Sequence, residues 1–210
     1  MREVPWWGVV SSAAAPVLLV GGWTLAASLQ PGFDPVDGTV SALAAIGAAD
    51  RWVMTLTFVA VGACYLLTAL ALRPAGTAGR LILVIGAAAG MLVAANPERP
   101  GDVYPWGHIV WAVIGLAGVS AWPAGAWRRG GTVPWGLRPA VAAAVVAVLL
   151  ALVGWFAAEL ITGSGQVGIA ERAAGTAQAL WPLAVVLSCR WPAGRPGPSR
   201  ILVRAPTGSD

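Results

Sequence analysis

The residues most suited to chemistry in this chain lie in three polar stretches that separate long apolar runs. Asp37 is in "PGFDPVDGTVSALAAIGAAD", the only histidine, His108, ends "NPERPGDVYPWGH", and Glu171 is near the end of "ELITGSGQVGIAER". A histidine exchanges protons near neutral pH, and a neighbouring carboxylate can orient its ring. We therefore predict an acid–base site with His108, Asp37 and Glu171 as its catalytic residues.

The same stretches contain polar and aromatic residues that could bind a ligand. Asp37 and Ser41 are four residues apart, so they would share one face of a short helix. A charged group at membrane depth is costly unless it is paired, which makes an acid or arginine beside an apolar run a functional candidate. We predict that four residues bind the ligand: Ser41, Asn96, Arg172 and Trp111.

A structural role would explain several of these residues equally well. Asp37 or Thr39 could cap a short helix, and Glu171 could stabilise the N-terminus of the last helix through the helix dipole. His108 could be an interfacial hydrogen-bonding residue. Both interpretations stay open at the level of sequence.

Metal and cofactor chemistry has little support in the composition. The chain has one histidine and two cysteines, Cys64 and Cys189, which lie far apart in apolar stretches. Zinc sites use clustered cysteine and histidine ligands, and a buried free cysteine behaves as a small apolar residue. We expect no metal site, no cofactor and no disulfide.

Long apolar runs position these polar stretches. Hydrophobic residues make up 58% of the 210 residues and charged residues 10%, which is typical of an integral membrane protein. A helix needs roughly 20 apolar residues to cross a bilayer. Six segments approach this length: 8–29, 52–72, 78–96, 107–127, 139–160 and 172–189. The short connections predict an all-α, compact bundle of six transmembrane helices that are antiparallel to their neighbours in the chain.

The arginines predict the orientation of this bundle. All 13 basic residues are Arg, and positive residues are retained on the cytoplasmic side of a membrane. With the N-terminus inside, three arginines are external, Arg51, Arg99 and Arg172, and the other ten are cytoplasmic. We therefore expect both termini in the cytoplasm, a disordered cytoplasmic tail at 190–210, and a multi-pass protein of the inner (plasma) membrane. The net charge of +4 reflects this asymmetry and does not indicate a nucleic-acid partner.

Several short motifs, taken in order, resemble a known family. They are "PGFDPVDGTVSAL" after the first apolar run, "RWVMT" at the start of the second, an Asn-Pro turn that leads to a helix headed by histidine, and "ER" before the last run. Together they resemble domain of unknown function family 998. The resemblance implies a bacterial membrane protein of six helices. Members carry an acidic residue at the position of Gly38, whereas this chain has Asp37 one residue earlier.

Three functions are compatible with these features. We favour an uncharacterised membrane protein with an outward-facing polar pocket that binds or modifies a lipid-like or other amphiphilic small molecule. Its partners would then be membrane lipids and that small molecule. A small-molecule transporter would need a polar route through the bundle, and a non-catalytic membrane scaffold would need no pocket at all.

The orientation can be tested with reporter fusions. A reporter joined at Gly130 is expected to be cytoplasmic, because arginines flank this residue in its connection. A reporter joined at Gly101, in the next connection toward the N-terminus, is expected to be external. Paired alkaline phosphatase and green fluorescent protein fusions measure this directly. The reverse pattern would contradict the predicted orientation.

Overall fold

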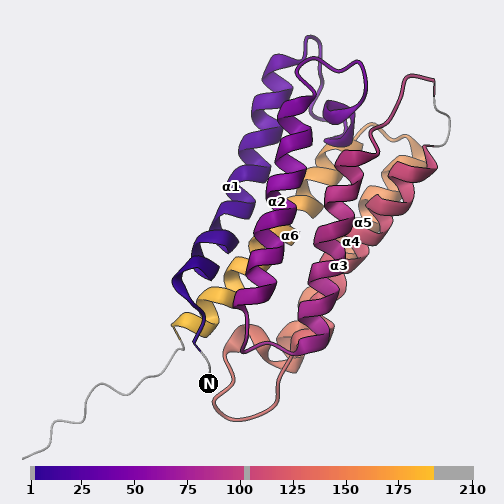
Figure 1. Cartoon of the computed structure of the whole chain (residues 1–210). Helices are drawn as coiled ribbons and strands as arrows, with labels where there is room; N and C mark the ends of the chain where they lie inside the picture. The colour runs from indigo at the N-terminus through magenta and orange to yellow at the C-terminus, as the bar shows by residue number, and fades with distance from the viewer. Residues whose placement is uncertain (1–2, 102–104, 192–210) are drawn as a thin grey trace, which may run out of the picture.

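The computed structural model of the chain describes residues 3–101 and 105–191 (Figure 1). The predicted tail therefore lies almost entirely outside the described residues. Six long helices and two short 3-10 helices make up the described part, in which no strand occurs. The long helices are α1 (Trp6–Leu29), α2 (Trp52–Ala71), α3 (Thr77–Ala95), α4 (Trp106–Ala126), α5 (Pro139–Thr162) and α6 (Val167–Arg190). The short ones are η1 (Ser41–Ala44) and η2 (Trp135–Leu137).

Each of the six predicted segments is a helix, as expected for apolar runs of this length. Within the described residues, α1 to α5 are long and apolar enough to cross a membrane. Helix α6 is as long as α1, but Glu171, Arg172 and Gln178 lower its mean hydropathy. It begins five residues before the predicted segment, at Val167, and its apolar part follows Arg172.

The helices form a closed arrangement. Each long helix packs against the next one in the chain, and α6 packs against α1 as well as α5. The core between them contains large, fully buried side chains such as Met54, Leu83 and Trp122. Helix α5 contributes least to this core, because Ala142 and Leu149 are its only buried residues.

The connections gather at two ends of the bundle (Figure 1). We call one the acidic end; it comprises the connections α1–α2, α3–α4 and α5–α6. The other, the arginine end, comprises the connections α2–α3 and α4–α5 together with the start of α1 and the end of α6. Exposed tryptophans lie at both ends, Trp52 and Trp106 at the first and Trp6 and Trp191 at the second. Such rings prefer the interface between membrane and water, so these tryptophans mark the two edges of the apolar layer of the bundle.

Helices α3 and α4 approach each other closely through glycine. A Cβ atom at Gly86 would lie 2.9 Å from the backbone nitrogen of Val119, and one at Gly118 would lie 2.9 Å from the Cα of Gly86. Gly90, four residues after Gly86, has open space at its Cβ position. Small residues permit such backbone contact between membrane helices. This packing fixes α4, and therefore His108, against the end of α3.

Candidate functional site

Glu171 joins the last helix to the first connection at the acidic end. Its Oε2 accepts a hydrogen bond of 2.5 Å from the backbone N–H of Val40, and its Oε1 accepts a longer one of 3.4 Å from the hydroxyl of Ser41. Val40 and Ser41 lie at the start of η1, where the Thr39 hydroxyl accepts a hydrogen bond from Ala42 N–H. The carboxylate therefore sits against a short capped turn from the other half of the chain.

His108 contacts the same serine. Its Nε2 lies 3.2 Å from the Ser41 hydroxyl oxygen and 3.3 Å from Oε1 of Glu98, while its Nδ1 lies 3.1 Å from the main-chain oxygen of Asn96. A carbonyl oxygen can only accept, so Nδ1 must carry a hydrogen. This leaves Nε2 as the nitrogen that can exchange a proton with Ser41 or Glu98.

Glu171, Ser41, His108 and Glu98 form a continuous chain of polar groups, which we call the His108 cluster. The side chain of His108 is 7% exposed and that of Glu98 is 35% exposed. The imidazole is therefore shielded by protein, and Glu98 connects the cluster to the solvent.

The single hydroxyl hydrogen of Ser41 couples the two ends of this chain. When Ser41 donates its hydrogen to Glu171, the contact between Ser41 and His108 is a hydrogen bond only if Nε2 carries a hydrogen. When Ser41 donates instead to Nε2, the contact between Ser41 and Glu171 is a hydrogen bond only if the Glu171 carboxyl is protonated. One proton can thus reside on His108 or on Glu171 while both hydrogen bonds are kept.

The surroundings of Glu171 favour its protonated form. Glu171 lies in the layer of connections, before the apolar part of α6. Burial raises the pKa of its carboxyl to about 7, an effect that the hydrogen bond from Val40 and the charge of Arg172 only partly offset. The group is therefore able to change its protonation state near neutral pH.

Arg172 fixes the first connection onto α6. One terminal nitrogen of its guanidinium donates to the main-chain oxygens of Pro35, Gly38 and Gly168, each at 2.9 Å. The guanidinium also lies 5.6 Å from the centre of the Phe33 ring, within the range of a cation–π contact. Arg172 thus binds the polypeptide that carries Val40 and Ser41, and this anchoring positions the serine of the His108 cluster.

Two glycines permit this close approach. A Cβ atom at Gly168 would collide with the main-chain oxygens of Gly38 and Pro35, and one at Gly38 would lie 2.5 Å from the Phe33 ring. An acidic side chain at position 38 would therefore displace the ring.

The structure brings together some of the predicted site residues and not others. His108, Glu171 and Ser41 are in contact, and Asn96 takes part through its main-chain oxygen. Asp37 is exposed, in a turn before η1, and within the described part of the chain its carboxylate has no hydrogen bond or ion pair. Trp111 is half-buried on α4, three residues after His108.

Glu98 is a member of the cluster that the prediction did not include. It follows the end of α3 by three residues, and His108 is the third residue of α4. The ends of a connection between antiparallel helices must lie close together, so the sequence could have predicted that Glu98 lies near His108. The main-chain oxygen of Glu98 also accepts a hydrogen bond of 2.8 Å from Ile46 N–H, which attaches the second connection to the first.

The described residues contain no group of three or more histidine, cysteine or acidic side chains that could hold a metal ion. Both cysteines, Cys64 and Cys189, are free and partly buried. The chemistry that the cluster itself offers is the movement of a proton among a hydroxyl, an imidazole and two carboxyl groups.

The bundle and its apolar spans define a polytopic helical membrane protein. Its sequence matches the family model described as "Protein of unknown function (DUF998)" over residues 13–188, and the chain belongs to this family. No curated protein and no solved structure matches the chain.

The raised pKa of Glu171 predicts a pH dependence of stability. Unfolding lowers this pKa from about 7 to its ordinary value of 4.5, so the unfolded state loses the proton first as the pH rises. The contribution of Glu171 to stability should be complete below pH 4.5 and decline until about pH 7. We expect the temperature midpoint of thermal unfolding of the wild type in detergent to decrease as the pH is raised from 4.5 to about 7.

Glu171→Gln should remove at least half of this decline, because the amide keeps an oxygen for Val40 but does not titrate. The matched control is Asp37→Asn, an exposed acid of the same end, which should keep the wild-type slope. An unchanged slope in Glu171→Gln would contradict the assignment.

Proposed function

We propose that this protein binds and chemically modifies an amphiphilic, lipid-like molecule at the acidic end of the bundle, with His108 as its acid–base group. The observation that carries the proposal is the Ser41 hydroxyl, which lies between the imidazole of His108 and the carboxyl of Glu171. A hydroxyl within hydrogen-bond reach of a base that a third group orients is a common arrangement in acyl and related group transfer.

Each member of the His108 cluster has a defined role in this proposal. Nε2 of His108 takes up or releases the proton, and the Asn96 carbonyl fixes the ring through Nδ1–H. Ser41 passes a proton between His108 and Glu171, and Glu98 exchanges it with the solvent. Arg172 is a positioning residue, because it acts by anchoring the connection that carries Ser41.

The depth of the cluster supports an amphiphilic substrate. Trp106 begins α4 two residues before His108, and its ring is 67% exposed. Because exposed tryptophans prefer the interface, His108 would lie at the level of lipid headgroups. A substrate with an apolar tail could keep that tail in the bilayer while its polar part meets the cluster. Trp111, one turn further along α4, would contact the tail.

Transport has less support from the interior of the bundle. Several polar side chains there pair between helices: Gln178 donates to the Leu116 carbonyl and to Ser120, and Ser11 lies 2.9 Å from Thr68. Among the described residues these polar groups are occupied by protein partners, which argues against a polar path through the bundle. A scaffold role would give no reason to place a shielded histidine between two carboxyl groups.

The proposed location is the outer face of a bacterial plasma membrane. The arginine end would then face the cytoplasm, as positive residues in short connections require. A multi-pass arrangement follows from the apolar helices, and the sidedness depends on the fusion experiment described above.

The test is a comparison of lipid composition before and after incubation with the purified protein. Nanodiscs prepared from the lipids of the expressing cells would contain either the wild type or His108→Ala, with empty discs as the blank. We expect mass spectrometry to detect a converted lipid with the wild type and a rate lower by about 100-fold or more with His108→Ala, the range for loss of an acid–base group. Ser41→Ala should also lose most of the conversion.

The matched control is Asp50→Asn, which changes an exposed acid of the same end outside the His108 cluster. It should convert lipid at the wild-type rate. Equal conversion by the wild type and His108→Ala would remove His108 from the mechanism. No conversion in any disc, with no amphiphile enriched over empty discs, would refute the proposed function.

A further inference from the structure

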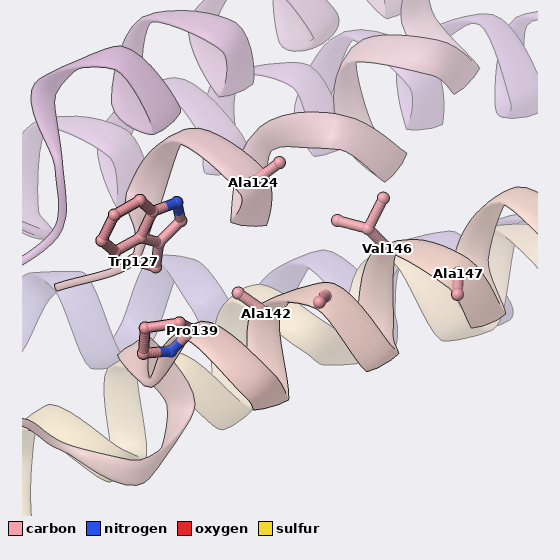
Figure 2. A pocket seen from close by; sticks show the side chains of 7 residues that line it. Ala124, Trp127, Pro139, Ala142, Val146 and Ala147 are labelled. Atoms are coloured by element: carbon pink, nitrogen blue, oxygen red, sulfur yellow. The ribbon is translucent and has the colours of Figure 1, made fainter. Parts of the chain in front are cut away.

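A second feature lies at the arginine end, away from the His108 cluster. A groove of about 380 Å³ runs between α4 and α5 (Figure 2). Its lining is apolar and formed mostly by small side chains: Ala124, Trp127, Pro139, Ala142, Ala143, Val146 and Ala147. Trp127 and Pro139 lie at one end of the groove and Ala147 at the other (Figure 2).

The groove follows α5 along the bundle axis. From Pro139 to Ala147 the helix rises about 12 Å, at 1.5 Å per residue. This helix is the most apolar of the candidate membrane spans and has the fewest buried residues. The groove therefore opens onto the hydrocarbon layer, where an extended apolar chain is the natural occupant.

Two arginines flank the end of the groove that carries Trp127 and Pro139. Arg138 directly precedes Pro139, and the guanidinium of Arg129 lies 5.0 Å from the centre of the Trp127 ring. A hydrogen bond of 2.8 Å from Arg128 N–H to the Leu137 oxygen brings these two segments together. Both Arg129 and Arg138 are exposed.

Three other arginines of this end have protein partners, whereas Arg73 is exposed and has none among the described residues. Arg80 donates to the Ala69 oxygen, Arg128 to the oxygens of Pro74 and Ala75, and Arg190 to the Val4 oxygen. Within the described part of the chain, Arg129 and Arg138 have no acidic or carbonyl partner, and Glu3 is the sole acid of the arginine end. Two positive charges thus stand beside an apolar groove without compensation from the protein.

We propose that this groove is a binding site for one anionic phospholipid, separate from the His108 cluster. An acyl chain lies along α5 against Ala143 and Ala147, and the phosphate is bound by Arg129 and Arg138. Guanidinium groups suit this role because they donate paired hydrogen bonds to phosphate oxygens. The combination of an apolar groove with two unpaired cations at its interfacial end matches both parts of such a lipid.

Native mass spectrometry of the full-length protein in detergent can test this site. The probes are phosphatidylglycerol and phosphatidylcholine with identical acyl chains. We expect one phosphatidylglycerol to bind at least tenfold more tightly than phosphatidylcholine. The double variant Arg129→Gln/Arg138→Gln should weaken phosphatidylglycerol binding by roughly 25-fold, about fivefold per charge. Arg73→Gln, which changes an exposed arginine of the α2–α3 connection, should leave this affinity unchanged.

A groove-filling variant tests the acyl-chain part separately. Ala143→Phe keeps both arginines and should weaken the binding of phosphatidylglycerol, because the ring occupies the groove. Equal affinity for the two lipids in the wild type, which needs no variant to fold, would overturn the proposal. So would full binding by the double variant, or a wild-type dimer that Ala143→Phe converts to a monomer, because the groove would then be an interface between two copies.

Discussion

The acidic end depends on the contacts that the carboxyl group of Glu171 makes with the first connection. This carboxyl group reaches from the last helix to the backbone of Val40 and the hydroxyl of Ser41, about 130 residues earlier in the chain, and so joins the two halves of the sequence. Arg172, the next residue, binds the same connection through two carbonyls, those of Pro35 and Gly38. Main-chain groups bond to Oε2 of Glu171 and to one terminal nitrogen of Arg172, while the other terminal nitrogen of Arg172 is buried without a hydrogen-bond partner among the described residues. The serine that contacts His108 is held in place by these two side chains.

The two ends of the bundle differ in chemistry as well as in charge. At the acidic end, polar groups converge and share hydrogens, and the imidazole is shielded from water. At the arginine end, Arg80, Arg128 and Arg190 bind main-chain carbonyls, and Arg129 and Arg138 stand beside an apolar groove. The packed helices separate the two ends of the bundle, so a substitution at one end makes no direct contact with residues of the other.

The sequence predicted the helices well because a run of about 20 apolar residues has few alternatives in a membrane. The start of α6 was placed five residues late, since Glu171 and Arg172 make its first turns polar. Asp37 was expected beside Ser41 from a spacing of four residues, which applies only within a helix. The short helix begins at Ser41 itself, so Asp37 precedes it in an exposed turn. The contact of Glu171 with Val40 depends on how two connections fold over one another, and no local pattern specifies that. The contact of His108 with Glu98 was open to prediction, because the two residues stand at the ends of the connection between α3 and α4.

The most direct test of the central claim uses the single histidine of the chain. Selective nitrogen-15 labelling gives NMR signals from the two ring nitrogens of His108 alone. The account predicts that the neutral ring carries its hydrogen on Nδ1, which faces the Asn96 carbonyl, and that Glu171→Gln changes the Nε2 signal, because Nε2 contacts Glu171 through the hydroxyl of Ser41. A neutral ring with its hydrogen on Nε2, or an Nε2 signal that Glu171→Gln leaves unchanged, would contradict it.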